Sequence, residues 1–351
     1  MRYPAPNTAK VILTPEWLTE ALSIRYPGVV VSAVNVVAVL GPVATKIRFT
    51  VDYAKAPEDA PRALCAKGLL DTAHPRVLES GTSEREARFY LEIAPKTTVR
   101  VPALAYGGID PETRHGLIIT EDLIESGAQF LGAMSPRTVE QTRSTLDQLA
   151  RLHSLCWGGK GLDAFPWVEP ELQKVAANPY LTLAEQQALL EDPRGEHLPR
   201  GLLSAERLHA GMQRLAEHSS KFASCVCHGD FHAGNLYTDA NGQPGVLDWQ
   251  LVMRSNWALD VAYHLGTILT VEDREASERE LLKYYLDRLR AYEVEPPAWE
   301  EAWLQYRVHM IYGYFQWAMT RWVKPPTIIY EFFRRIGLAL ASLESYELLG
   351  V

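Results

Sequence analysis

Two aspartates and one asparagine lie close together in the second half of the 351-residue chain. The chain contains the stretch His228-Gly229-Asp230-Phe231-His232-Ala233-Gly234-Asn235, and Asp248 ends a short apolar run after a turn at residues 239–242. Phosphoryl transfer needs a carboxylate that deprotonates or orients a hydroxyl, and hard oxygen ligands for the Mg²⁺ that bridges nucleotide phosphates. The spacing of Asp230 and Asn235 matches the pattern H-R-D-x-x-x-x-N, with Gly229 in place of Arg. This pattern therefore indicates nucleotide-dependent phosphoryl transfer.

Two other interpretations of this stretch imply different chemistry. Asp230 and Asn235 could simply shape a turn, but their combination with Asp248 favours the functional interpretation. Alternatively, the histidines at 228 and 232 could bind zinc together with the cysteines at 225 and 227, because thiolates and imidazoles are the ligands that zinc prefers. On a strand, however, the odd-numbered cysteines and the even-numbered histidines point to opposite faces. We therefore interpret His228 and His232 as orienting residues.

The elements before residue 123 are predicted to form a sheet. Apolar and polar side chains alternate strictly over residues 46–53, which is the period of a half-buried antiparallel strand. This strand follows a valine-rich run at residues 29–40 across a short turn, so the two should form a hairpin. Further strands are expected at residues 63–67, 99–106 and 116–120, with one helix at residues 83–94.

Helices are predicted to dominate the rest of the chain. Ser135 followed by Pro136 predicts a helix start, and the apolar spacing extends to a Gly-Gly pair at residues 158–159. Further helices are expected at residues 182–190, 205–217, 257–269, 275–292 and 299–322. Strands followed by helices indicate an α+β fold. We expect a sheet portion at residues 1–122 and a helical portion at residues 123–351.

Composition excludes several classes of protein. The chain has 35 Lys and Arg against 43 Asp and Glu, a net charge of −8, which disfavours a dedicated binder of duplex nucleic acid. Four cysteines are too few for a disulfide framework and fit a reducing compartment, so we expect a cytoplasmic protein. The first residues lack the apolar stretch of a signal peptide, and polar residues interrupt the most apolar window, residues 29–44. No membrane span is predicted.

Several motifs together make the sequence resemble a family of protein-kinase-like small-molecule kinases. This is the aminoglycoside phosphotransferase, choline kinase and ecdysteroid kinase group, and the similarity is strongest to the ecdysteroid-kinase-like branch. The motifs are residues 228–235, Asp248-Trp249-Gln250, Asp260-Val261-Ala262-Tyr263, Leu149-Ala150-Arg151-Leu152-His153 and Thr120-Glu121-Asp122-Leu123. The resemblance implies a bilobal fold with a small antiparallel-sheet lobe and a larger helical lobe.

The resemblance also implies roles for three aspartates and one asparagine in the second half of the chain. Asp230 would accept or orient the proton of the substrate hydroxyl, and Asn235 and Asp248 would hold Mg²⁺. Asp260 would brace the catalytic loop from a neighbouring helix. The phosphoryl donor would be ATP.

In the first half, the resemblance assigns nucleotide contacts. Lys67 would contact the α- and β-phosphates, although lysines often end strands simply as solvated residues. Glu86 would pair with Lys67, yet Ser83-x-x-Glu86 is also typical of a capping box. The backbone of Glu121 to Leu123 would meet adenine. Gly41 is the single glycine of the turn at residues 40–45, where protein kinases carry G-x-G-x-x-G, and Pro42 removes a backbone donor. A non-catalytic, nucleotide-binding pseudokinase therefore remains a second hypothesis.

The acceptor is expected to be a small hydroxylated molecule. Only eleven residues separate Asp248 from Asp260, which leaves no room for the activation segment that binds a peptide, so no protein substrate is expected. Aromatic residues are dense at residues 299–333; core packing is the default interpretation of each, but their number suits an apolar or ring-bearing alcohol. The alternative is an aminoglycoside or other sugar-antibiotic kinase, which would need a carboxylate-lined groove.

Overall fold

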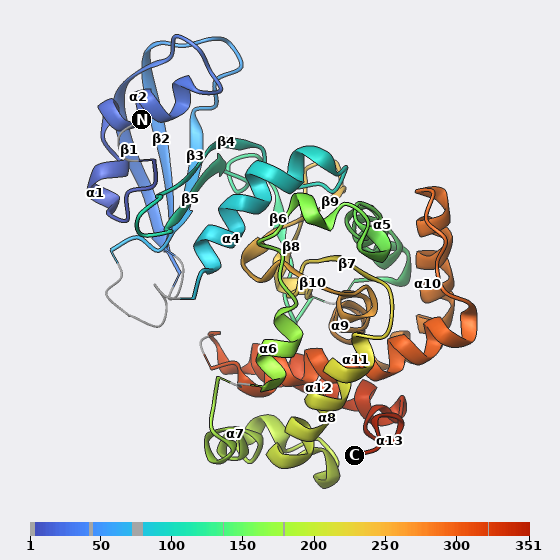
Figure 1. Ribbon diagram of the computed structural model, residues 1–351. Coiled ribbons are helices and arrows are strands. Elements are labelled where there is room, and N and C mark those ends of the chain that lie inside the picture. The colour runs from blue at the N-terminus through green and yellow to red at the C-terminus, as the bar shows by residue number, and fades with distance from the viewer. Residues whose placement is uncertain (1–3, 42–44, 72–79, 136, 178–179, 322) are drawn as a thin grey trace. The chain divides into compact units, whose positions relative to one another are not determined.

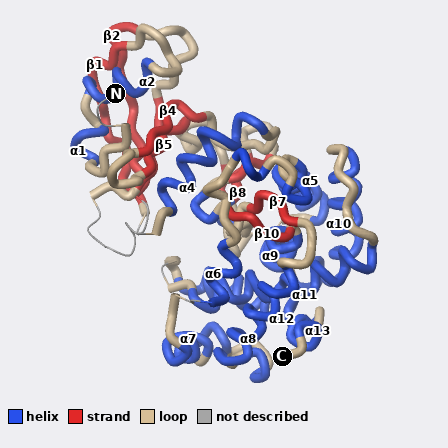
Figure 2. The backbone as a smooth tube through the Cα atoms, in the orientation of Figure 1, coloured by secondary structure: helices blue, strands red, loops and turns tan. Residues whose placement is uncertain are grey.

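The alternating stretch at residues 46–53 lies within strand β2 (Thr45–Lys55) of the computed structural model of the chain (Figure 1). The structure describes residues 4–41, 45–71, 80–135, 137–177, 180–321 and 323–351. Ile47, Phe49 and Val51 are at most 1% exposed, as the alternation predicts. The fold is α+β, with strands gathered in the first part of the chain and helices dominating the rest (Figure 2).

The chain divides into two structural units. The first comprises Met1–Gln129, Asp239–Gly242 and Val246–Leu251, and the second comprises Phe130–Thr238, Gln243–Gly245 and Val252–Val351. The sequence predicted a division after residue 122. In the structure, the short segment that carries Asp248 belongs to the same unit as Lys67 and Glu86, although about 160 to 180 residues separate it from them along the chain.

A five-stranded antiparallel sheet forms the centre of the first unit. Its strands lie in the order β1–β2–β3–β5–β4. Their bounds are β1 Val30–Leu40, β2 Thr45–Lys55, β3 Ala63–Gly68, β4 Leu104–Ile109 and β5 Gly116–Glu121. Two amino-terminal helices, α1 (Ala9–Ile12) and α2 (Pro15–Ser23), contribute to a core with the apolar side chains of the sheet.

One face of strand β3 lies in this core, and its other face carries Lys67, a predicted site residue. Leu64 and Ala66 are fully buried in the core that includes α2. Because side chains alternate along a strand, Cys65 and Lys67 point to the other face. Helix α4 (Thr82–Arg88) carries Glu86, which pairs with Lys67 there. A π-helical turn, Phe89–Ile93, continues α4, so the predicted helix at residues 83–94 is present with a wider final turn.

Helices build the second unit. They are α5 Val139–Ser154, α6 Glu171–Ala177, α7 Leu183–Leu190, α8 Ala205–Ser219, α9 Ala258–Ile268, α10 Val271–Ala291, α11 Trp299–Met319, α12 Pro326–Ser342 and α13 Ser345–Leu349. Helix α11 packs against α8, α9, α12 and α13 (Figure 1). None of the helices in the described residues is long and apolar enough to cross a membrane.

Short strands flank the predicted catalytic loop. Strand β7 (Ser224–Cys227) pairs antiparallel with β10 (Met253–Asn256). A second small sheet has the order β6–β8–β9, with bounds Gln129–Phe130, Leu236–Thr238 and Pro244–Val246. The loop between β7 and β8 contains Asp230, and Gly229 within it has φ = 81°, a left-handed conformation that glycine adopts without strain.

Helix α5 begins later than the sequence predicted. We expected Ser135 to cap it, but the helix begins at Val139 with Thr138 as its N-cap. Thr138 Oγ1 accepts from the Gln141 N–H at 3.2 Å, and Gln141 Oε1 accepts from the Thr138 N–H at 3.1 Å. This reciprocal capping box satisfies two helix-terminal donors, which is the physical reason for the later start.

Replacing Thr138 with alanine should lower the free energy of unfolding by about 1 kcal/mol, because an orphan N–H at the start of α5 loses its acceptor. Chemical denaturation measures this change. Thr138→Ser, which keeps the hydroxyl, is the control and should stay close to wild type. Equal stability of Thr138→Ala and wild type would show that the box contributes nothing.

Candidate active site

Lys67 lies between two carboxylates in the first unit. Its Nζ donates to Glu86 Oε1 at 2.8 Å and to Asp248 Oδ1 at 2.9 Å. The side chains of Lys67 and Glu86 are 8% and 5% exposed, whereas that of Asp248 is 27% exposed. Glu86 therefore pairs with Lys67. It does not cap α4, whose N-cap residue is Gly81.

Two contacts hold the segment that carries Asp248 against α4 and the π-helical turn that follows it. The Trp249 N–H donates to Glu86 Oε1 at 3.2 Å, and the buried Trp249 ring stacks on Phe89 with centroids 3.6 Å apart. Asp248 has φ = 62°, an uncommon conformation for a residue with a side chain. Such backbone strain persists only where surrounding contacts hold it, and it is often found at functional sites.

The charge balance around Lys67 keeps its ammonium ion protonated. Burial alone would lower the pKa of Lys67, but the carboxylates of Asp248 and Glu86 outweigh burial and raise it. A permanently charged, donor-only ammonium group suits an anionic ligand such as a phosphate. Asp248, a partly exposed carboxylate, supplies the hard oxygen atoms that Mg²⁺ prefers. The donor chemistry of this group therefore fits a magnesium-bound phosphate.

The other residues of this unit that were predicted to contact the nucleotide are Gly41, Glu121 and Leu123, and they differ in exposure and hydrogen bonding. Gly41 is exposed, with φ = 101°, and residues 42–44 of its turn lie outside the described residues. Glu121 ends β5, and its Oε1 accepts from the Ala103 N–H at 2.9 Å. The carbonyl of Leu123 accepts from the Ala128 N–H at 2.9 Å. These contacts fix the backbone of the predicted hinge.

Asp230 lies in the second unit with both carboxylate oxygens engaged. Tyr263 Oη donates to Oδ1 at 3.2 Å, and Asn235 Nδ2 donates to Oδ2 at 2.9 Å and to the Asp230 carbonyl at 2.8 Å. The Asp230 side chain is 28% exposed. Burial raises the pKa of Tyr263 well above its usual value, and the negative charge of Asp230 adds to that effect. The phenol therefore stays protonated and remains a donor to the carboxylate.

Asp260 supports the loop from α9. Its Oδ2 accepts from the His228 N–H at 2.6 Å and its Oδ1 accepts from the Gly229 N–H at 2.9 Å. Its Oδ2 also lies 3.1 Å from His153 Nε2, and both side chains are completely buried. On the other side of the loop, Tyr312 Oη donates to the Gly229 carbonyl at 2.6 Å. The backbone before Asp230 is thus held at three atoms.

His232 borders Asp230 in a defined tautomer. Its Nδ1 accepts from the Gly234 N–H at 3.0 Å, so the neutral ring carries its proton on Nε2. Nε2 lies 3.7 Å from Asp230 Oδ2. The ring packs edge-on against Trp317 and Phe332, with centroids 5.1 and 5.4 Å apart. An N–H donor and an aromatic wall therefore lie next to the carboxylate.

The family follows from a sequence comparison. The sequence model described as "Phosphotransferase enzyme family" matches residues 69–303, two thirds of the chain. The chain belongs to this family. Asp230, Asn235 and Asp248 lie within the matched residues, and Lys67 lies just before them. A search of curated proteins gives no match.

Solved structures agree with the fold of this phosphotransferase. An ethanolamine kinase from Plasmodium vivax aligns with a TM-score of 0.52 and 11% identity, covering 99% of this chain and 93% of the other. A GDP complex of aminoglycoside 2'-phosphotransferase-IIIa aligns with a TM-score of 0.50 and 13% identity, covering 94% and 99%. At these identities the comparison establishes the protein-kinase-like fold alone, with its sheet and helical portions.

Three contacts of the phosphotransferase that support predicted site residues could not be predicted from the sequence patterns alone. Tyr263 donates to Asp230 and Tyr312 donates to Gly229. Arg48 Nε donates to buried Asp122, within the predicted hinge, at 2.8 Å. One signal was available, because Asp260 and Tyr263 are three residues apart and so share a helix face. The other two contacts join residues 74 and 83 positions apart, a distance over which no sequence period operates.

Most aromatic residues of the region 299–333 belong to the core. Seven of them are at most 3% exposed, namely Tyr306, Tyr312, Tyr314, Phe315, Trp317, Phe332 and Phe333. Trp299 and Trp303 are half-buried and stack on each other with centroids 5.8 Å apart. Trp322 lies outside the described residues. Of the aromatic side chains in α11 and α12, Trp317 and Phe332 are the ones that contact His232, beside Asp230.

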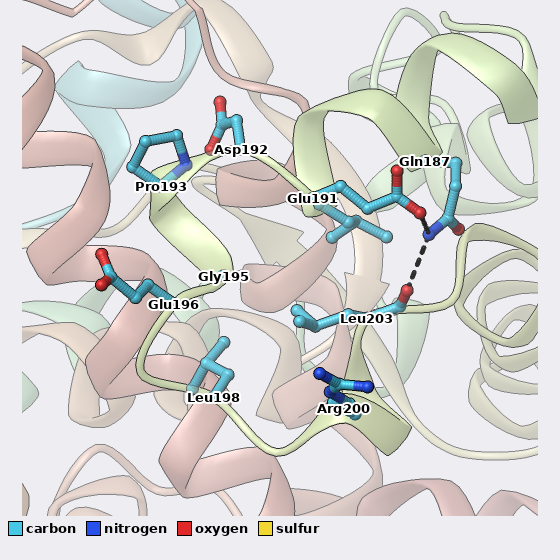
Figure 3. A pocket seen from close by; sticks show the side chains of 10 residues that line it. Gln187, Glu191, Asp192, Pro193, Gly195, Glu196, Leu198, Arg200 and Leu203 are labelled. Atoms are coloured by element: carbon cyan, nitrogen blue, oxygen red, sulfur yellow. Dashed lines mark hydrogen bonds between the residues drawn. The ribbon is translucent and has the colours of Figure 1, made fainter.

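A separate cavity of about 690 Å³ lies in the second unit (Figure 3). It is lined by Gln187, Leu190, Glu191, Asp192, Pro193, Gly195, Glu196, Leu198, Arg200 and Leu203. Gln187 Nε2 donates to Glu191 Oε1 and to the Leu203 carbonyl, which joins the two sides of the cavity. Three carboxylates against one guanidinium give the wall an acidic balance. None of the predicted catalytic residues lines it.

Asp260→Ala should destabilise the protein by about 3–5 kcal/mol, because it leaves two loop N–H groups and His153 without their buried acceptor. Chemical denaturation measures the loss. Asp163→Ala, which removes an exposed carboxylate, should change stability by less than about 0.5 kcal/mol. If the free energy of unfolding of Asp260→Ala also matched that of wild type, Asp260 would have no bracing role.

Proposed function

We propose that this phosphotransferase transfers the γ-phosphoryl group of ATP, with Mg²⁺, to a hydroxyl group of a small and fairly hydrophobic molecule. The observation that carries the proposal is the state of Asp230. Its carboxylate is partly exposed, while Tyr263 and Asn235 fix its orientation. A fixed carboxylate with access to solvent can accept or orient the proton of an incoming hydroxyl.

The proposed chemistry is an in-line displacement. Asp230 holds the proton of the acceptor hydroxyl while its oxygen attacks the γ-phosphorus, and the bond to the β-phosphate oxygen breaks. Asp248 and Asn235 would hold Mg²⁺, which supplies charge neutralisation at the phosphate oxygens when it is bound. Asn235 donates through Nδ2 to Asp230, so its Oδ1 is the atom suited to the cation.

Nucleotide binding is assigned to the first unit. Lys67 would contact the α- and β-phosphates, and its pairing with Glu86 fixes the direction of its long side chain. The N–H of Gly41 would approach the phosphates, and the backbone from Glu121 to Leu123 would meet the adenine. Positioning by many weak contacts is the main means of catalysis in phosphoryl transfer, which suits this division of roles.

The surroundings of Asp230 favour an acceptor with apolar surface. Trp317 and Phe332 pack around His232, so a molecule that reaches Asp230 meets ring edges and one N–H donor. This chemistry supports the ecdysteroid-kinase-like branch of the family as the finer assignment. Between Asp248 and Asp260 lie a 3₁₀ turn, Trp249–Leu251, strand β10 and the start of α9. Because this connection is short, we propose a small molecule and not a peptide as the acceptor.

The second candidate acceptor is a polycationic aminosugar. The cavity in Figure 3 carries Glu191, Asp192 and Glu196, and carboxylates are the groups that bind ammonium ions, but Asp230 does not line this cavity. One structural neighbour is an aminoglycoside phosphotransferase. Asp192, however, already pairs with Arg194 at 3.0 Å, which reduces the charge available to a ligand.

A two-stage experiment tests these proposals. The thermal unfolding midpoint with and without MgATP reports nucleotide binding, and ADP release is then measured against panels of hydrophobic alcohols, sterols, ethanolamine-type amines and aminoglycosides. Turnover on the alcohols or sterols supports the first candidate, and turnover confined to aminoglycosides supports the second. A stabilising effect of MgATP without turnover on any panel contradicts catalysis and supports a nucleotide-binding pseudokinase.

Asp230→Asn should lower kcat by about 100-fold to 10,000-fold, the usual contribution of a general base. The thermal shift with MgATP should be retained, since the nucleotide contacts are assigned elsewhere. Asp163→Asn is the matched control and should keep full activity. Turnover of Asp230→Asn at the wild-type rate would remove Asp230 from the mechanism.

Lys67→Met should lower kcat/KM for ATP by about 10-fold to 100-fold, the equivalent of one charge-assisted hydrogen bond. Lys55→Met, which changes an exposed lysine at the end of β2, should leave it unchanged. Circular dichroism checks that both variants fold. An unaltered kcat/KM in a folded Lys67→Met protein would refute the phosphate contact.

A further inference from the structure

Three of the four cysteines of the chain lie near the end of α5 and the strand that leads into the catalytic loop. Cys225 and Cys227 are completely buried on β7, and Cys156, two residues after α5, is 2% exposed. Because side chains alternate along a strand, Cys225 and Cys227 share one face of β7. The fourth cysteine, Cys65, lies on β3 of the first unit. The thiols are thus concentrated at one place in the second unit.

His153, in the last turn of α5, completes a compact donor set with two of these thiols. The ligand atoms of His153, Cys225 and Cys227 all lie within 4.8 Å of one another, and all three side chains are 0% exposed. The two sulfur atoms are 3.7 Å apart. Two thiolates that bind one tetrahedral Zn²⁺ at their usual bond length are about 3.8 Å apart. The thiols therefore already have the separation that such an ion requires.

The surroundings of the imidazole suit a metal ligand. His153 Nε2 lies 3.1 Å from Asp260 Oδ2, and Nδ1 lies 2.7 Å from Tyr285 Oη. A metal-bound histidine usually keeps a hydrogen bond from its other ring nitrogen to a carboxylate or another acceptor, which fixes the ring. Both ring nitrogens already have a partner, so an ion would displace Asp260 or Tyr285 from one nitrogen while the other nitrogen kept its contact.

The charge of the group would also match a divalent cation. Two thiolates neutralise one Zn²⁺, and thiolate and imidazole donors favour zinc over the hard cations Mg²⁺ and Ca²⁺. His228 and His232, which the sequence placed in a possible zinc group with these cysteines, have other contacts. His228 Nδ1 accepts from the Asp230 N–H and His232 Nδ1 accepts from the Gly234 N–H.

We propose that Cys225, Cys227 and His153 bind one Zn²⁺ ion that joins β7 to α5 beneath the catalytic loop. Cys227 directly precedes His228, and His153 contacts the same Asp260 that holds the loop. An ion at this point would stabilise the base of the loop and take no part in phosphoryl transfer. The proposal stands independently of the function assigned to Asp230.

Metal analysis of the full-length protein tests the site without any substrate. The protein is produced in zinc-supplemented medium, treated with EDTA, and separated by gel filtration before elemental analysis. The expected result is close to one zinc per chain. Replacing zinc with Co²⁺ should produce a thiolate-to-cobalt charge-transfer band. Wild-type protein with neither bound zinc nor a cobalt band would overturn the proposal.

Single substitutions identify the ligands. Cys225→Ser and Cys227→Ser should each lower the bound metal by more than about tenfold, because serine is a poor ligand for zinc. Cys65→Ser is the matched control and should keep both the zinc and the cobalt spectrum. Full metal content in both β7 variants would show that the ion binds elsewhere and would also overturn the proposal. The wild-type cobalt spectrum decides the question even if a variant fails to fold.

Discussion

The buried carboxylate of Asp260 is the constraint on which the geometry of the second unit depends. An ionised group with no exposure to water destabilises a fold unless partners surround it, and here two loop N–H groups and His153 do so. These contacts fix α9, α5 and the end of β7 relative to one another. The loop conformation also requires a left-handed residue, which explains glycine at position 229 where protein kinases carry arginine.

In the first unit the buried charged group is a cation, the ammonium group of Lys67, and carboxylates surround it. Lys67 is buried because Glu86 and Asp248 both accept from it, and the stacking of Trp249 on Phe89 holds Asp248 at its strained backbone angle. In both units the supporting groups are almost inaccessible. Asp230 and Asp248, the carboxylates assigned to chemistry and metal binding, are each a little over a quarter exposed.

Aromatic and thiol side chains form the dry surroundings that make these contacts strong. Electrostatic interactions gain strength where water is excluded, and the helices α9 and α11 place Tyr263, Tyr312 and Trp317 around the loop. Two of these aromatic residues reach the loop with hydroxyl groups, so the same side chains fill the core and orient polar atoms. The cysteines of β7 are completely buried, and α5 packs against this strand.

Much of this protein could be read from its sequence. Strand alternation predicted the buried face of β2, and the order of elements predicted the α+β fold. The spacing of Asp230 and Asn235, with Asp248 after the next turn, marked these three as candidate site residues, and their roles stay a prediction. Only the tertiary structure decided the rest. It paired Glu86 with Lys67 instead of with the start of α4, brought Tyr312 to Gly229, and grouped Cys225 and Cys227 with His153. These contacts join residues 19 to 83 positions apart, and no local periodicity encodes how such elements pack.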